Sequence, residues 1–205
     1  MPVTDVYLPA SPEDLNTKIF SFLASQNIVN GFFIEAGAAD GFDQSNTLGL
    51  ENYLGWNGLL VEALQDQYQL CLDNRKNMIV EHGALVERDY PHDTVTIYQH
   101  EMPLCSFVEG SSGGETYVRK ETTPAVTLDD LILKHKIIKI DFFSLDVERG
   151  ELNALKGLNL NIHRPTYMCI ETGQFKEINN YLNSYDYELV EALTSHDYLY
   201  KDLKT

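Results

Sequence analysis

The chain has 205 residues and 43% hydrophobic content, which is enough to build one core, so we expect a single domain over residues 1–205. A formal net charge of −16 and an isoelectric point near 4.6 argue against nucleic acid as a partner, because an acidic surface repels the phosphate backbone. No stretch approaches the roughly 18 apolar residues of a membrane span, and the N-terminus lacks a signal-peptide pattern, so we expect a cytoplasmic protein without a membrane span.

The first part of the chain alternates helical and strand patterns. From Ser11, a Ser cap, a Pro at the first helical position and apolar residues at helical spacing predict a helix, and we expect residues 1–27 to pack on the domain as a helical segment. Short apolar runs then predict strands, separated by segments with helical spacing. The predicted strands cover residues 31–37, 56–63 and 78–86, and the predicted helices cover residues 45–55 and 64–77.

The middle of the chain is less regular. Residues 94–100 predict one additional strand, whereas residues 106–125 are a Gly/Ser loop followed by a polar segment, for which we expect no regular element. The stretch "SFVEGSSGGETY" at residues 106–117 is long enough to cover a site, and we expect it to form the wall that faces a substrate.

The alternation resumes from Thr127. Helices are predicted at residues 127–135, 151–158 and 175–185, and strands at residues 137–148 and 164–172. Residues 187–193 and 197–203 form two further predicted strands, which a short turn joins as an antiparallel pair. The order indicates an α/β fold with a mainly parallel sheet and an antiparallel C-terminal hairpin.

The first predicted strand runs into the turn "EAGAADG", where a dinucleotide-binding fold would carry G-x-G-x-x-G to hold pyrophosphate. Both Glu35 and Asp40 lie in this turn, and a carboxylate about 6 Å from a phosphate charge costs on the order of 3 kcal/mol at an effective dielectric constant of 20. Pyrophosphate is therefore disfavoured. S-adenosylmethionine fits better, because it carries an ammonium and a sulfonium where a dinucleotide carries phosphates.

The predicted strand ends supply contacts for such a ligand. Glu35 or the turn backbone can accept from the ammonium, and the helix predicted from Ser45 can receive the ligand carboxylate. Glu62, at the end of the second strand, has the position at which nucleotide folds place an acid that binds the ribose hydroxyls.

Taken together, five motifs in this order and at this spacing resemble the FkbM family of S-adenosylmethionine-dependent methyltransferases. The motifs are "FFIEAGAADGFDQSNT", "ENYLGWNGLLVEA", "VTLDDLI", "IDFFSLDVERGELNALKG" and "HRPTYMCIET", and the resemblance covers most of the chain. It implies a class I methyltransferase (Rossmann-like) three-layer fold and O-methylation of a sugar or another natural-product hydroxyl. Two positions depart from the family pattern: Ala39 replaces the usual Asn, and Arg149-Gly150 replaces a Gly followed by a small residue.

The resemblance also implies which residues bind the cofactor. Around the methionine end it places Glu35, Gly37, Asp40, Ser45, Asn46 and Thr47. It assigns Glu62 to the ribose, and it places the segment Gly83, Ala84 and Leu85 at the adenine.

The candidates for the chemistry are three acids at the ends of later strands, namely Asp146, Glu148 and Glu171. Methyl transfer to oxygen needs the acceptor close to the methyl carbon and a base for the hydroxyl proton, and Asp146 is the first choice for that base, with His100 a weaker candidate. The same acids could instead hold a divalent ion, but we expect catalysis without a metal. The expected acceptor is a sugar or glycan.

Two other functions remain open from the sequence. One is a catalytically silent nucleotide- or glycan-binding module of the same fold, for instance one domain of a longer glycan-building protein. The other is an NAD-dependent oxidoreductase, which would need a phosphate-binding turn that the sequence lacks. Trp56 with Tyr53 is either a sugar-stacking platform or part of the core, and the widely spaced cysteines Cys71, Cys105 and Cys169 indicate free structural thiols.

Overall fold

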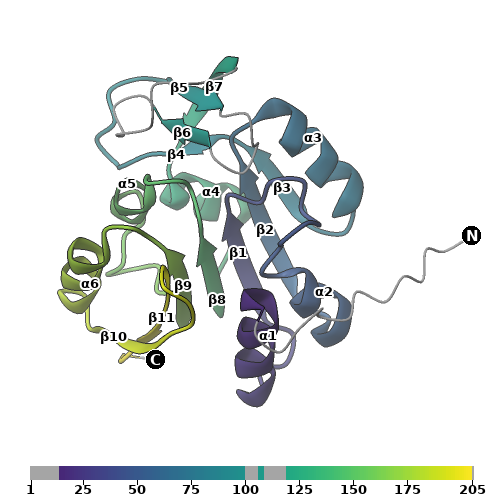
Figure 1. The fold of residues 1–205 in the computed structure, drawn as a ribbon, viewed down its shortest axis with the longest axis vertical. Coiled ribbons are helices and arrows are strands. Elements are labelled where there is room, and N and C mark those ends of the chain that lie inside the picture. Colours follow the sequence, from purple (N-terminus) through teal and green to yellow (C-terminus); the bar gives the residue numbers. More distant parts are fainter. Residues whose placement is uncertain (1–13, 100–105, 109–118, 205) are drawn as a thin grey trace, which may run out of the picture.

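The computed structural model describes residues 14–99, 106–108 and 119–204, and its centre is a seven-stranded sheet (Figure 1). The strand order is β3-β2-β1-β8-β9-β11-β10, in which β11 alone runs opposite to the other six strands. Its strands are β1 (Phe32–Ala36), β2 (Asn57–Glu62), β3 (Ile79–His82), β8 (Phe142–Leu145), β9 (Tyr167–Glu171), β10 (Tyr187–Ala192) and β11 (Asp197–Asp202). The predicted α/β class with a mainly parallel sheet and an antiparallel C-terminal hairpin is confirmed.

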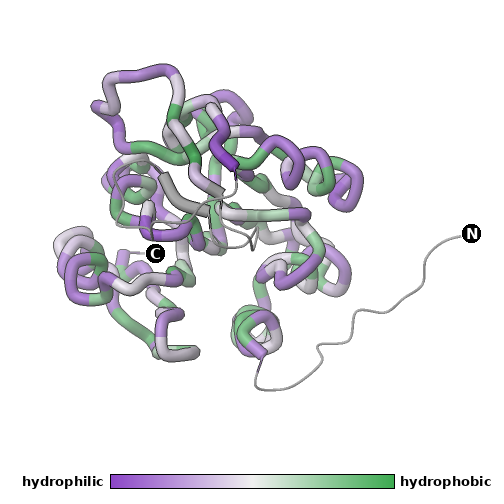
Figure 2. The backbone as a smooth tube through the Cα atoms, turned by 45° about the horizontal axis from the view of Figure 1, so that its top comes forward, coloured by the Kyte–Doolittle hydropathy of each residue, from purple (hydrophilic) through white to green (hydrophobic). Residues whose placement is uncertain are grey.

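Helices cover both faces of this sheet and give three layers. One face carries α1 (Leu15–Ser25), α2 (Leu48–Leu54) and α3 (Gln65–Asn74), and the other carries α4 (Leu128–His135), α5 (Glu151–Lys156) and α6 (Phe175–Asn183). Successive residues of a strand point to opposite faces, so Phe33 packs with the first set and Ile34 with the second. Along the helices the backbone alternates between hydrophilic and hydrophobic residues, as amphipathic elements require (Figure 2).

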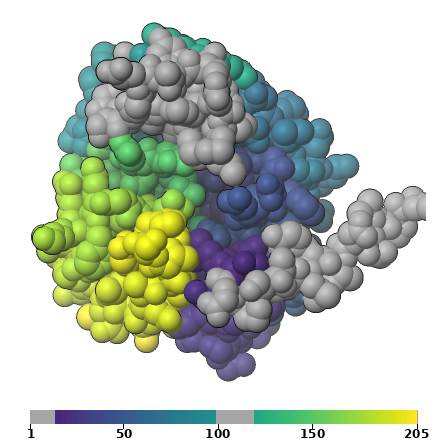
Figure 3. All heavy atoms as spheres, in the orientation of Figure 1, coloured from purple at the N-terminus to yellow at the C-terminus, as the bar shows by residue number. Residues whose placement is uncertain are grey.

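The C-terminal hairpin inserts in reverse order, because β11 lies between β9 and β10. Its residues lie beside α1 on one face of the molecule, and Lys18 Nζ donates to the carbonyl of Leu193 at 2.9 Å (Figure 3). The helix predicted from Ser11 is observed from Leu15, and residues 1–13 of the expected segment 1–27 lie outside the described residues.

A second, four-stranded sheet has the order β4-β7-β5-β6 and lies at the top of the view in Figure 1. It consists of β4 (Ala84–Leu85), β5 (Thr94–Gln99), β6 (Ser106–Val108) and β7 (Arg119–Val126). The expectation of no regular element over residues 106–125 was wrong here, because β7 pairs with β5 from Arg119 to Pro124 despite its polar sequence. The single strand predicted at residues 78–86 is broken at Gly83, and its second half joins the smaller sheet.

Two other predicted elements are shorter than expected. The helix predicted from Ser45 begins at Leu48 and ends at the left-handed Gly55 as predicted, and the strand predicted over residues 137–148 is regular only at Phe142–Leu145. Within the described ranges, none of the helices is both long and apolar enough to cross a membrane.

One close backbone approach joins the two central strands at their carboxyl ends. Gly37 follows β1 with a φ of 80°, and a Cβ there would lie 1.6 Å from the carbonyl oxygen of Asp146, which follows β8. The Asp146 amide in turn donates to the carbonyl of Ala36 at 3.0 Å. Only glycine fits this position, because both the space and the backbone conformation exclude a side chain.

We predict that Gly37→Ala lowers the free energy of unfolding by about 2 kcal/mol or more, since it adds a backbone clash to a left-handed conformation. Chemical denaturation measures this change. Gly55→Ala is the matched control, because Gly55 has a φ of 64° but nothing within 4 Å of the added Cβ; it should cost only about 1 kcal/mol. Equal losses in the two variants would contradict the close approach.

Candidate functional site

A cavity of about 620 Å³ opens where the parallel strands of the main sheet end. This is the rim at which open α/β sheets bind their ligands. Eleven of the residues selected from the sequence line it: Glu35, Gly37, Ser45, Asn46, Glu62, Gly83, Ala84, Leu85, Asp146, Glu148 and Glu171. The other two, Asp40 and Thr47, are not among its lining residues.

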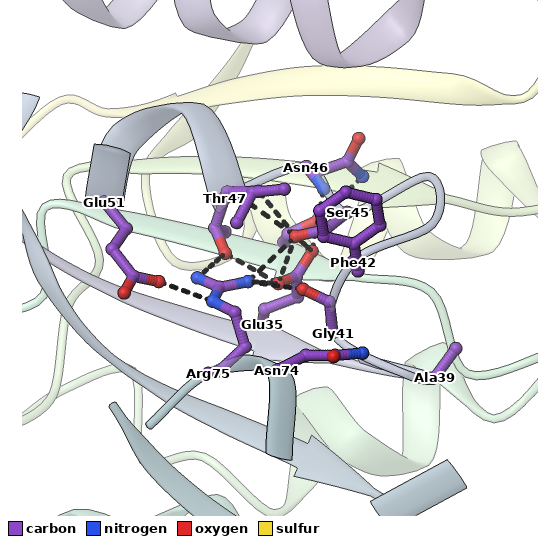
Figure 4. A network of polar contacts seen from close by, with 12 residues as sticks. Glu35, Ala39, Gly41, Phe42, Ser45, Asn46, Thr47, Glu51, Asn74 and Arg75 are labelled. Carbon is purple, nitrogen blue, oxygen red and sulfur yellow. Dashed lines mark hydrogen bonds and ion pairs between the residues drawn. The ribbon is translucent and has the colours of Figure 1, made fainter. Parts of the chain in front are cut away.

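The carboxylate of Glu35 is buried and occupied by contacts within the protein. Oε1 accepts from the backbone N–H of Asn46 at 2.8 Å, Oε2 accepts from the Thr47 hydroxyl at 2.6 Å, and the Ser45 hydroxyl lies 3.0 to 3.1 Å from both oxygens. Arg75 Nη1 adds an ion pair with Oε2 at 3.6 Å (Figure 4). Glu35 therefore holds the loop after β1, which leaves the turn backbone to receive a ligand.

Asp40 and Thr47 act on the shape of the same loop. Asp40 Oδ1 accepts from the amides of Phe42 and Asp43 at 2.9 and 2.8 Å, which closes a local turn. Thr47 is fully buried, and its hydroxyl accepts from Arg75 Nη2 at 3.1 Å while donating to Glu35.

Glu62 points into the cavity from the end of β2. Its oxygens accept from the amides of Ala39 and Leu64 at 2.8 and 2.7 Å, so one carboxylate joins the turn after β1 to the end of β2. Only 7% of the residue is exposed, and burial raises the pKa of Glu62 against the opposing effect of these amides. Because Glu62 lines the cavity, its carboxylate is placed to accept from a pair of adjacent hydroxyls.

The wall beyond Glu62 is largely apolar. Gly83, Ala84 and Leu85 approach from the break between β3 and β4, and Ile97 of β5 faces them from the smaller sheet. Such a wall suits a flat heterocycle, whose polar edge can use the nearby backbone groups.

Acidic residues gather at the opposite end of the cavity. Asp146 follows β8 and Glu171 ends the neighbouring strand β9, so each carboxyl group affects the protonation of the other. Burial, together with the charges of Glu171 and Glu148, raises the pKa of Asp146 to about 9. Burial is also the main cause that raises the pKa of Glu148 to about 7, and the pKa of Glu171 is raised in the same way.

The turn between β8 and α5 holds these acids in an uncommon backbone conformation. Glu148 and Arg149 have φ angles of 52° and 76°, which non-glycine residues seldom adopt. Glu151 compensates from the first turn of α5, because its buried carboxylate accepts from the Arg149 amide at 2.7 Å. Nothing in the sequence marked Glu151 as different from a surface acid.

His196 and Asp197 join the acidic end from the turn before β11. His196 Nε2 lies 3.8 Å from Glu171 Oε1 and 3.7 Å from Asp197 Oδ2, and all three ligand-type atoms lie within 4.8 Å of one another. These distances would allow one shared ion, although Asp197 already accepts from the Thr194 hydroxyl. No local pattern pointed to His196, because in the sequence it belongs to a short predicted turn. The expectation of catalysis without a metal stays a prediction.

Other residues considered from the sequence lie away from the cavity. Trp56 is 1% exposed and packs in the core, and neither it nor Tyr53 lines the cavity, so the sugar-stacking alternative has no support. Burial raises the pKa of the Cys71 thiol to about 12, as expected for a structural cysteine. Cys105 and His100 lie outside the described residues, as does most of the loop at residues 106–117, of which only β6 is described.

Comparison with known proteins identifies the family. The sequence model described as "Methyltransferase FkbM domain" matches residues 35–200, which include both ends of the cavity. The chain belongs to this family. No curated protein matches the sequence of this FkbM methyltransferase domain.

Solved structures of other methyltransferases share the fold at low sequence identity. The human methyltransferase 10 domain containing protein is 13% identical with a TM-score of 0.51, and the match covers 91% of this chain and 80% of that one. The METTL16 methyltransferase domain is 13% identical with a TM-score of 0.49, and the match covers 89% of this chain but only 63% of the METTL16 chain. M. jannaschii TYW2 in complex with AdoMet is 9% identical with a TM-score of 0.45, and the match covers 96% of this chain and 80% of that one.

The fold is therefore that of a class I, Rossmann-like methyltransferase, and the cofactor is S-adenosylmethionine. The residues present fit this cofactor: the cavity combines a glycine turn, a buried carboxylate and an apolar wall. Beside them, the acidic end offers groups that can take up a proton.

We predict that the melting temperature of this FkbM domain falls as the pH rises from about 5 to about 9. The folded protein keeps protons on Asp146 and Glu148, whose pKa values are about 9 and about 7, whereas the unfolded chain loses them near pH 4. Their contribution to stability is thus complete below the unfolded pKa and is lost as the pH rises through the folded pKa. Asp146→Asn should flatten this dependence, and scanning calorimetry across the range measures it. Parallel curves for the two proteins would contradict the raised pKa.

Proposed function

We propose that this chain is an S-adenosylmethionine-dependent O-methyltransferase that acts on a hydroxyl of a sugar or glycan. One observation carries the proposal: the approach of Gly37 to Asp146 brings a cofactor-type turn and a proton-accepting acid cluster into one cavity. We further propose that residues 1–205 form one such domain, with α1 and the preceding residues as its N-terminal segment.

The cofactor end of the cavity assigns separate tasks to its residues. The backbone around Gly37 and the polar side chains of Ser45 and Asn46 would hold the methionine end, within a loop whose shape Glu35, Asp40 and Thr47 maintain. Glu62 would accept from the ribose hydroxyls, and Ala84 with Leu85 would border the adenine. When bound, the cofactor supplies an activated methyl group, and these residues keep it oriented toward the acidic end.

The acidic end would orient the acceptor and receive its proton. The pKa of Asp146 is raised to about 9, so its carboxyl group holds a proton at neutral pH and can form a hydrogen bond with a hydroxyl of the acceptor. We assign the proton transfer to the ionised form of Asp146, which is the minor form at neutral pH, with Glu171 and Glu148 setting its basicity. A raised pKa makes Asp146 a stronger base once it is ionised.

The charge of the cavity favours a neutral acceptor rich in hydroxyl groups. Its described lining includes neither Lys nor Arg. It includes seven residues with a carboxyl group, namely Asp14, Glu35, Asp43, Glu62, Asp146, Glu148 and Glu171. A phosphate or carboxylate on the acceptor would meet only repulsion from these groups, whereas sugar hydroxyls can donate to them.

Direct measurement of turnover tests the function. We expect S-adenosylhomocysteine to form when the chain is incubated with S-adenosylmethionine and a panel of neutral sugars, with methylated sugar detected by mass spectrometry. Turnover should persist after exhaustive EDTA treatment, since we propose that carboxylates alone carry the proton transfer. Loss on EDTA and recovery with magnesium would instead recast Asp146, Glu148 and Glu171 as metal ligands. Tight cofactor binding with no product from any acceptor would favour the silent module, and preferred binding of NAD would favour the oxidoreductase.

We predict that two substitutions separate cofactor binding from chemistry. Glu62→Ala removes a charge-assisted contact worth roughly 1.5 to 3 kcal/mol, so the Kd for S-adenosylhomocysteine should rise by about one to two orders of magnitude. Asp146→Asn keeps the shape of the side chain but cannot take up the proton, so turnover should fall by about 10²-fold or more with little change in that Kd. Calorimetry and steady-state kinetics measure the two effects, and normal turnover by Asp146→Asn would refute its assignment as the base.

A further inference from the structure

Arg75 is a buried residue that touches several parts of the cofactor site without lining the cavity. It follows the C-terminus of α3, and 1% of its surface is exposed. Figure 4 shows its guanidinium between Glu51 of α2 and Glu35 of β1, with the loop after β1 above it. The guanidinium therefore connects three segments of the chain that are distant in sequence.

Each guanidinium nitrogen has a partner. Nε donates to Glu51 Oε2 at 2.5 Å, and Nη2 donates to the Thr47 hydroxyl at 3.1 Å. Nη1 donates to the carbonyl of Gly41 at 3.0 Å and to the Ser45 hydroxyl at 3.1 Å. The positive charge also lies 3.6 Å from Glu35 Oε2, so two carboxylates on neighbouring elements balance one buried cation.

The loop that Arg75 contacts depends on such side-chain contacts for its shape. Residues 41–47 form neither helix nor strand, and Gly41 and Gln44 have φ angles of 73° and 57°. A Cβ at Gly41 would lie 2.7 Å from Cys71 Sγ and 2.8 Å from Arg75 Cγ, so the loop backbone rests directly on the end of α3.

The other side of this loop faces the cavity. Its residues Asp43, Gln44, Ser45 and Asn46 belong to the cavity lining, next to the glycine turn. The same Ser45 hydroxyl that receives a hydrogen bond from Arg75 contacts Glu35, and Asn46 Nδ2 continues to the Ser144 hydroxyl at 3.0 Å. A displacement of the guanidinium would consequently reach the wall of the cofactor site.

We propose that Arg75 is a positioning residue for the cofactor: it holds the loop at residues 41–47 in its binding conformation through Glu35, Ser45, Thr47 and the carbonyl of Gly41. This inference rests on the cofactor site proposed above. A preformed loop lowers the cost of ordering when the ligand binds, so Arg75 raises cofactor affinity without touching the ligand.

Lysine cannot replace arginine in this role. A guanidinium presents five donors in a rigid plane, whereas an ammonium presents three donors around a point. Here the guanidinium contacts one oxygen on each of four side chains and the backbone carbonyl of Gly41. Arg75→Lys thus keeps the charge opposite Glu35 and Glu51 but cannot hold the loop at all its contacts.

The test compares Arg75→Lys with Arg164→Lys. Arg164 is also a largely buried arginine, paired with Asp202 and donating to the carbonyls of Leu160 and Tyr185 at 2.6 and 2.7 Å, but it does not line or border the cavity. We expect both variants to melt at lower temperature. Only Arg75→Lys should raise the Kd for S-adenosylhomocysteine, by about tenfold or more, measured by calorimetry at a temperature where both variants are folded.

A second measurement reports how often the loop at residues 41–47 opens. Without any ligand, amide hydrogen exchange over residues 41–47 should be faster in Arg75→Lys than in the wild type and unchanged in Arg164→Lys. If Arg75→Lys does not fold, Glu51→Gln serves instead, because it removes one charge from the guanidinium's partners; it should raise the Kd about threefold and speed exchange in the same loop.

Wild-type affinity and loop exchange in Arg75→Lys, or an equal loss of affinity in Arg164→Lys, would overturn the inference. Failure of the proposed cofactor site would look different, because the wild-type chain itself would then fail to bind S-adenosylhomocysteine. Failure of the proposed reaction alone would leave the wild-type Kd unchanged and would appear only as absence of turnover.

Discussion

The approach of the backbone at Gly37 to the carbonyl of Asp146 is the constraint on which the site depends. The two residues follow adjacent parallel strands, and the missing Cβ at Gly37 lets the chain leave both strands at the same level. With a larger residue, the turn after β1 and the acids after β8 would have to separate. Because they do not, a cofactor-type loop and a proton-accepting pair share one cavity, and methyl transfer needs this proximity.

The protein stabilises its buried carboxylates in two different ways. Glu35 is neutralised by Arg75 and by hydroxyl and amide donors, so it serves as a fixed part of the loop. Asp146 and Glu171 have no such guanidinium among the lining residues, and the pKa of each is raised instead. The first arrangement gives rigidity, and the second leaves a group whose charge can change during a reaction.

Both places where the sequence departs from the family pattern have a strained backbone. Ala39 and Arg149 stand where the family usually carries Asn and Gly, and both have left-handed φ angles, 46° and 76°. Asn and Gly adopt this conformation at lower cost than Ala or Arg. In each case a buried glutamate holds the strained amide: Glu62 accepts from Ala39, and Glu151 accepts from Arg149. Such strain is commonly stored at functional sites.

The sequence by itself determined the order of helices and strands, the parallel sheet and most of the residues at its rim, because apolar periodicity is local and the ends of parallel strands meet at one edge. It failed for β7, whose polar residues form a strand only because β5 pairs with them, and for the insertion of β11 beside β9. The tasks of Arg75 and His196 were likewise decided only in the tertiary structure. In the sequence Arg75 reads as a surface residue and His196 as part of a short turn, since burial and ion pairing depend on segments far along the chain that no local pattern records.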